Sequence, residues 1–437
     1  MSNRARPGGD PQTPLREFAR LESVREILKQ RPLRLIFIAN AVSMLGSGMN
    51  SAAATWYILQ ATHSEAALGT MVTLGSLPAL LMLPFTGVVI DREDRRRLVM
   101  LLDAARAAVI LIITVLALRH QVQVWQLYAM VLLVSAGFWM FWPTVTALIQ
   151  ELTPDAEFVH ANTFLLAGIQ GGWIMAGALV GFIYDHVGLG GVLLIDVSSY
   201  IISFACYFAV RKGRVVVLRP AEPAAESAEG AIQRFISEMR EGLSFLRGRT
   251  YVVMLGISWA LFIAGMLAQG VVTAPLSERI LHAGARGYGY LNGGWAMGAF
   301  LSAWYAPWAI RVLRARPSVA WSMALLAVSL YVMPHSVMLA AAFALYAIMG
   351  SARGIGGVAI SSSMMEIVPK HFMGRVQNTF YFAATALQMA LAFTVGAVSH
   401  RIGLAWGFAI IGSVYLFAAL TSWWPVPEQA RVSAAAD

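Results

Sequence analysis

The chain has 437 residues, of which 58% are hydrophobic and 13% charged, and its mean hydropathy is +0.65. Soluble proteins carry about 25% charged residues, so the composition excludes a soluble globular protein and indicates a polytopic helical membrane protein. The net charge of +9 predicts topology signals and contacts with anionic headgroups rather than nucleic-acid binding.

The N-terminal segment, residues 1–32, is polar and arginine-rich and has no signal-peptide pattern. We expect a cytoplasmic tail in which residues 23–30 form a short amphipathic helix on the membrane. Six apolar runs follow, each about 20 or more residues long, which is the length needed to span about 30 Å of hydrocarbon. They lie near 33–60, 66–90, 98–118, 124–148, 160–184 and 189–210.

A polar segment, 211–250, separates these runs from a second set, and the apolar spacing over 232–246 predicts a surface helix within it. The second set lies near 251–278, 287–313, 317–334, 338–365, 374–399 and 402–424, before a tail at 425–437. The sequence therefore predicts an all-α membrane protein with twelve transmembrane helices. Two six-helix bundles, 33–210 and 251–424, are joined by a cytoplasmic linker.

Lysine and arginine residues are unevenly distributed between the two sides. The loops of one side carry only Arg119, Arg279, Arg286 and Arg401. By the positive-inside rule the other side, with both termini, is cytoplasmic. Six of the eight histidines, including His63 and His400, fall on the outer side, where solvated loop positions or a pH sensor would explain them. The single cysteine, Cys206, excludes a disulfide framework.

A short pattern recurs at the same place in both halves. Glu-Leu-Thr-Pro at 151–154 precedes Asn-Thr-Phe at 162–164, and Glu-Ile-Val-Pro at 366–369 precedes Asn-Thr-Phe at 378–380. Each piece joins the fourth apolar run of its half to the fifth, at an offset of about 215 residues. Such recurrence predicts two parallel structural repeats, which is how many transporters are built.

Seven consecutive charged residues, 91–97, lie between the second and third runs. They cannot lie in hydrocarbon, so they form a short loop at a membrane face. Gly87 would let two helices approach closely, and Asp91 could bind an arginine or the start of a facing helix. A topogenic charge cluster with no further role is the alternative. The gate candidates, including two acids at symmetric helix ends, are Gly87, Asp91, Arg92, Arg95, Arg96, Glu151 and Glu366.

The loop pattern Gly-x-x-x-Asp-Arg-x-x-Arg-Arg resembles the signature loop of the major facilitator superfamily, and the resemblance covers about residues 33–424. The segments 103–106, 154–162 and 196–204 resemble its macrolide-efflux and enterobactin-exporter-like branch. The resemblance implies an alternating-access transporter whose first, second, fourth and fifth helices of each half line a central cavity. Run five lacks the usual proline, which weakens the antiporter signature. The loop at 311–316 keeps its bases but lacks an acid, so the gate chemistry of the two halves is expected to be asymmetric.

Polar and aromatic side chains on these helices are candidate substrate contacts. Four in the first run share one helical face, which helix packing explains equally well. The glutamines could orient a substrate or bind neighbouring backbone, and the aromatics could stack on a planar ligand or pack against lipid. The candidates are Asn40, Ser43, Ser47, Asn50, Phe138, Trp142, Gln170, Gln269, Gln388 and Arg353.

Arg353 lies near the middle of its run, hence near the bilayer midplane, where a charge costs about 2.5–3.5 kcal/mol. Its glycine-rich neighbours would leave room for a ligand carboxylate or phosphate, which the guanidinium fork suits. Pairing with Asp103, Asp196 or Glu366 is the alternative. Asp103, Asp196 and Arg106 are also coupling candidates, although the Asp103–Arg106 spacing predicts a structural ion pair.

The chain has no catalytic constellation and no Gly-x-x-x-x-Gly-Lys-Ser/Thr phosphate loop. The sequence therefore indicates a secondary transporter rather than an enzyme or an ATP-driven pump. We expect a proton-coupled exporter of a small amphipathic, anionic, siderophore- or drug-like molecule in the bacterial inner membrane. It would act as a monomer among membrane lipids, with no cofactor, metal or nucleic-acid partner. A lipid or lysolipid flippase, or an importer, is the alternative.

Overall fold

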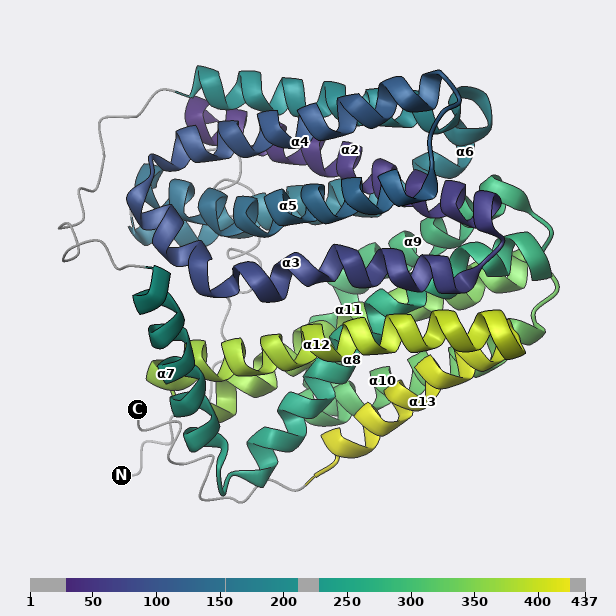
Figure 1. Ribbon diagram of the computed structural model, residues 1–437. Coiled ribbons are helices and arrows are strands. Elements are labelled where there is room, and N and C mark those ends of the chain that lie inside the picture. The colour runs from purple at the N-terminus through teal and green to yellow at the C-terminus, as the bar shows by residue number, and fades with distance from the viewer. Residues whose placement is uncertain (1–28, 154, 211–227, 425–437) are drawn as a thin grey trace, which may run out of the picture.

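The computed structural model describes residues 29–153, 155–210 and 228–424, which form helices and contain no strand (Figure 1). The first half contains α2 (Arg31–Thr62), α3 (Glu65–Arg92), α4 (Arg95–Leu118), α5 (Val124–Leu152) and α6 (Asp155–Ala209). The connecting helix is α7 (Ala228–Leu246). The second half contains α8 (Thr250–Pro275), α9 (Gly284–Leu313), α10 (Ala315–Val332), α11 (Leu339–Ile367), α12 (Lys370–Ile402) and α13 (Leu404–Ser422). A π-helical turn, η1 (Leu276–Ile280), extends α8, and a 3-10 turn, η2 (Met333–His335), extends α10.

Helix α6 consists of two spans joined at a bend. Its 55 residues would extend roughly 80 Å as one straight helix at 1.5 Å per residue, far more than a bilayer is thick. The chain turns back at Gly188, whose φ of 62° lies in the left-handed region that glycine adopts without steric cost. We call residues 155–187 the first arm of α6 and residues 189–209 the second arm.

Twelve membrane-crossing segments follow from the described helices. Ten of these helices are long and apolar enough to cross a membrane, with α6 counted as one. Counting the two arms of α6 separately gives eleven, and α9 is the twelfth. The many glycines of α9 lower its mean hydropathy, but α9 packs against α6 and α11 as the other helices pack against their neighbours. The predicted all-α architecture with twelve transmembrane helices is confirmed.

The two halves lie side by side, with the first half in purple to teal and the second in green to yellow (Figure 1). Helix α7 lies across one end of the bundle, which we call the α7 end; the opposite end is the far end. Helix α2 begins and α13 ends at the α7 end. The halves meet where α3 packs on α12 and where α6 packs on α9.

Candidate functional site

A buried ion pair lies in the core of the first half. Asp103 and Arg106, one turn apart on α4, form the ion pair that their spacing predicts, and they are 0% and 2% exposed. The second carboxylate oxygen of Asp103 accepts a hydrogen bond from Ser203 Oγ at 2.6 Å. The Arg106 guanidinium lies 4.3 Å from the ring centroid of Phe141 and 4.5 Å from that of Tyr200. These contacts offset part of the cost of removing both charges from water.

A second buried acid, Asp196, lies on the second arm of α6. Its Oδ2 accepts a hydrogen bond from Asn50 Nδ2 of α2 at 2.8 Å, and its Oδ1 accepts one from Ser199 Oγ at 3.3 Å. Asp103, Arg106 and Asp196 therefore place two carboxylates and one guanidinium in the same buried core. The set carries one net negative charge when both acids are ionised, and one bound proton would neutralise it.

The polar stripe on α2 faces α6 rather than an open cavity. The Ser47 hydroxyl lies 2.8 Å from the Tyr200 hydroxyl, and Tyr207 donates to Asn40 Oδ1 at 3.2 Å. Ser43 is 0% exposed. The first run was expected to line the substrate cavity through these residues and Asn50. In this arrangement Asn40, Ser47 and Asn50 bind side chains of α6, which is the helix-packing alternative, and cavity lining by this face stays a prediction.

Arg353 on α11 is partly buried and has no acidic partner among the described side chains. Its guanidinium lies 5.4 Å from the ring centroid of Trp295 and 5.9 Å from that of Phe262, and its Nε contacts Met266 Sδ at 2.6 Å. The acids offered as alternative partners lie elsewhere: Asp103 pairs with Arg106 and Asp196 binds Asn50, while Glu366 is exposed. The described surroundings of this cation are aromatic and apolar.

The glycines around Arg353 serve helix packing. A Cβ at Gly350 would lie 2.0 Å from the Trp295 carbonyl oxygen, and one at Gly354 would lie 1.8 Å from Ser302 Oγ. Gly350 and Gly354 therefore let α9 approach α11 closely, and the prediction that small neighbours leave room for a ligand rests on Gly357. Room near the guanidinium comes from the side of α8, where a Cβ at Gly357 would meet only the Phe262 ring, at 3.9 Å.

Two of the glutamine candidates, Gln388 and Gln269, are buried in this arrangement. Gln388 on α12 donates to the Ser76 hydroxyl on α3, which joins the two halves. Gln269 on α8 is 7% exposed. The side chain of Gln170 lies outside the described side chains.

Aromatic residues join the halves at a position that the sequence did not single out. The Trp139 ring on α5 lies 6.0 Å from Tyr381 on α12, and Tyr381 lies 6.4 Å from Trp259 on α8. All three side chains are partly exposed. Phe138, which was selected in place of Trp139, packs against Trp173 at 6.4 Å.

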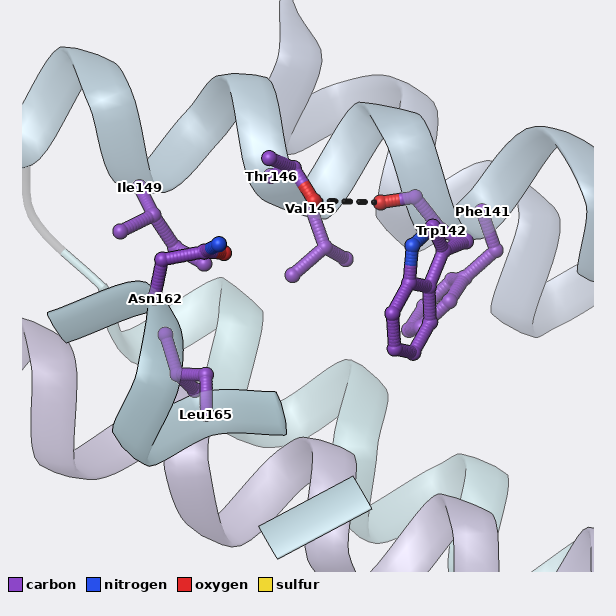
Figure 2. A pocket seen from close by; sticks show the side chains of 7 residues that line it. All are labelled: Phe141, Trp142, Val145, Thr146, Ile149, Asn162 and Leu165. Atoms are coloured by element: carbon purple, nitrogen blue, oxygen red, sulfur yellow. Dashed lines mark hydrogen bonds between the residues drawn. The ribbon is translucent and has the colours of Figure 1, made fainter. Parts of the chain in front are cut away.

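Trp142, the other aromatic candidate, faces a small pocket between α5 and the first arm of α6 (Figure 2). Its neighbours there include Val145, Ile149 and Leu165, and its carbonyl oxygen accepts a hydrogen bond from Thr146 at 3.2 Å. The lining is almost entirely apolar. Trp142 therefore packs within the first half, away from the Trp139–Tyr381 contact.

Two arginines of the charged loop fasten α4 to its neighbours at the α7 end. Arg95 Nη1 lies 3.0 Å from Glu151 Oε1 of α5, and Arg96 Nε donates to the carbonyl oxygen of Tyr207 at 2.7 Å, near the end of α6. Both contacts lie within the first half, so as described they do not cross between the halves.

The other gate candidates divide into three cases. A Cβ at Gly87 would meet nothing within 4 Å, so the close helix approach expected there is wrong. Glu366 is exposed and has no ion pair with a described side chain. Arg92 is the last residue of α3, and the side chain of Asp91 is outside the described set.

Glu151 and Glu366, which occupy equivalent positions in the two repeats, are thus expected to differ in their contribution to stability. Glu151→Gln removes the carboxylate from Arg95, and because the pair is partly exposed the loss is about 1 kcal/mol or less. We expect the thermal unfolding midpoint of purified protein to fall by about 1 °C or less, because the shift equals the lost free energy divided by the unfolding entropy of this long chain. The matched variant Glu366→Gln should leave the midpoint unchanged. Equal midpoints for the two variants would contradict a stabilising role for the Arg95–Glu151 pair.

The chain resembles known transport proteins in sequence and in structure. The family model described as Major Facilitator Superfamily matches residues 36–387. Macrolide efflux protein A of Streptococcus pyogenes is 24% identical over 212 residues, covering 48% of this chain and 50% of that protein. The MFS-type transporter YkuC of Bacillus subtilis is 24% identical over 392 residues, covering 84% and 86%. The chain thus spans about half the length of the first of these relatives and most of the second.

Among solved structures, a bacterial homologue of the iron transporter ferroportin in an inward-facing state superposes with a TM-score of 0.70 at 15% identity. The match covers 90% of this chain and 98% of that one. At this identity the likeness concerns the fold.

Proposed function

The chain belongs to the major facilitator superfamily and is a transporter rather than an enzyme, and from this premise we propose that it exports a small amphipathic molecule carrying an anionic group. Export by alternating access is supported by the relatives whose names describe efflux. We propose that the protein lies in a bacterial inner membrane with its α7 end facing the cytoplasm, because nearly all loop arginines lie at that end.

The observation that carries the substrate class is Arg353. A guanidinium at mid-helix, without a described acidic partner and between Trp295 and Phe262, is costly in a membrane unless a ligand or partner contacts it. Arginine binds carboxylates and phosphates through two parallel hydrogen bonds. The rings beside it would contact the apolar part of the same molecule. A carboxylate-bearing siderophore- or drug-like compound fits both features.

Proton coupling is proposed for the buried set of Asp103, Arg106 and Asp196. Asp103 pairs with Arg106 and Asp196 accepts a hydrogen bond from Asn50, so the set holds two acids and one guanidinium and a single proton changes its net charge. Proton carriers in transporters are buried acids of this kind. The alternative is a purely structural role, which variants of Asp103 and Arg106 distinguish from coupling.

Everted membrane vesicles test the proposal. Vesicles containing the protein should accumulate a carboxylate-bearing amphipathic substrate when their lumen is acidic, and a protonophore should abolish the accumulation. The methyl ester of the same compound should be transported poorly, because it lacks the anion. Equal transport of acid and ester would contradict the anionic class, and uptake into right-side-out vesicles would favour an importer. Movement of a fluorescent lysolipid between leaflets would favour a flippase.

A further inference from the structure

One carboxylate at the far end has only partners from the opposite half. Glu65 is the first residue of α3 and is 0% exposed. Arg279 Nη1 of η1 lies 2.6 Å from its Oε1, and His400 Nδ1 near the end of α12 lies 3.5 Å from its Oε2. Neither carboxylate oxygen has a hydrogen-bond partner among the described residues, so these two ion-pair contacts are its polar contacts there. The buried carboxylate of Glu65 therefore has its ion-pair partners only in the second half of the protein.

The same arginine also holds the adjacent turn. Arg279 Nη2 donates to the carbonyl oxygen of His63 at 2.6 Å. His63 ends α2 in the left-handed region, with a φ of 47°. The guanidinium of Arg279 thus binds the last residue before the turn between α2 and α3, His63, and the first residue after it, Glu65.

Backbone contacts surround this cluster. A Cβ at Gly69, one turn into α3, would lie 2.5 Å from the carbonyl oxygen of Ala392 on α12. One at Gly396 would lie 2.6 Å from the carbonyl oxygen of Glu65 itself. Helices α3 and α12 therefore touch through their backbones beside the buried carboxylate. The contact exists only while the halves are together at the far end.

We infer that Glu65, Arg279 and His400 form a latch that keeps the far end closed, and that Glu65 is the residue whose release permits opening. When the halves separate, the carboxylate becomes hydrated, and Arg279 and His400 move away from it together. The inference rests on alternating access in this family and not on the substrate or its charge.

A neighbouring ion pair provides a matched comparison. Asp185 on α6 and Arg286 on α9 also join the halves at the far end, at 3.5 Å, but their side chains are 46% and 61% exposed. Exposed pairs contribute little because water screens them. Removing one partner of a buried pair leaves an unpaired charge, and the equilibrium then shifts toward the state in which that charge is hydrated.

Pulsed EPR distances across the far end test the latch without a substrate. Nitroxides are placed at Gln121→Cys, after α4, and at Val337→Cys, before α11, in a Cys206→Ser background. Both chosen positions are exposed. In lipid nanodiscs the short distance should dominate for this parent protein. Glu65→Gln and Arg279→Gln should each raise the ratio of long to short distances about tenfold or more.

The control Arg286→Gln should leave the distance distribution unchanged. The inference fails if Glu65→Gln and Arg279→Gln give the distribution of Arg286→Gln, or if Arg286→Gln opens the far end equally. Should Glu65→Gln not yield folded protein, Arg279→Gln decides the question, because the Arg279 side chain is 41% exposed and its substitution removes no buried side chain.

Discussion

Arg353→Ala is expected to weaken binding of an anionic amphipathic substrate by roughly ten- to a hundredfold. A hydrogen bond to a charged group contributes about 1.5–3 kcal/mol, and the described surroundings of Arg353 contain no acid that would otherwise hold the guanidinium. Arg353→Lys retains the charge but loses the planar fork, so it should bind with intermediate affinity. Isothermal titration calorimetry of the detergent-purified variants with the carboxylate substrate measures the two affinities.

The neutral ester of the substrate is the control ligand, and its weaker affinity should be the same for wild type and Arg353→Ala. Arg311→Ala, at an exposed position near the end of α9, is the control variant and should bind like wild type. A loss of folded yield in Arg353→Ala, restored by a second substitution at an acidic residue, would show a structural ion pair. Unchanged affinity in a well-folded Arg353→Ala would equally refute the ligand contact.

Arg106→Ala should abolish or strongly reduce folding, which is the largest effect expected from any single change here. It would leave Asp103 charged and buried without its partner, and breaking such a pair costs about 3–5 kcal/mol. It would also remove the cation from between Phe141 and Tyr200. The yield of monodisperse protein in size-exclusion chromatography and its unfolding temperature measure the loss.

The paired change Asp103→Asn with Arg106→Met should recover much of the yield, since no unpaired charge remains. Arg119→Ala, at an exposed position after α4, is the control and should fold like wild type. If Arg106→Ala folds normally, the ion pair has no structural role. If the double variant folds but no longer responds to a pH gradient in vesicles, the buried set takes part in coupling.

The sequence predicts the spans well because span length is a property of the chain itself. About 20 apolar residues are needed per crossing, and the bends fall where the runs break, as at Gly188. What a helix faces is harder to predict. In a membrane both lipid and protein core are apolar, so the stripe of Asn40, Ser47 and Asn50 gave no indication of whether it pointed at a cavity or at α6.

Contacts between distant helices account for the remaining differences. Trp139 and Phe138 are neighbours in sequence, and only the position of Tyr381 on α12 distinguishes them. Glu65 and His400 lie at the ends of apolar runs, where loop residues are ordinarily solvated. Their pairing requires the two halves to meet, and no local pattern encodes the distance between α3 and α12. The Asp103–Arg106 pair could be predicted because both residues lie on one helix.

The glycine contacts beside Glu65 recur on the other side of the far end, where a Cβ at Gly181 would lie 2.4 Å from the Cα of Gly289. A barrier made of backbone touching backbone leaves little space through which water or protons could leak. The glycines themselves carry no side chain that would have to rotate before the helices part. A transporter needs a closed end that is tight but opens quickly. The glycine contacts between α3 and α12 and between α6 and α9 provide both properties.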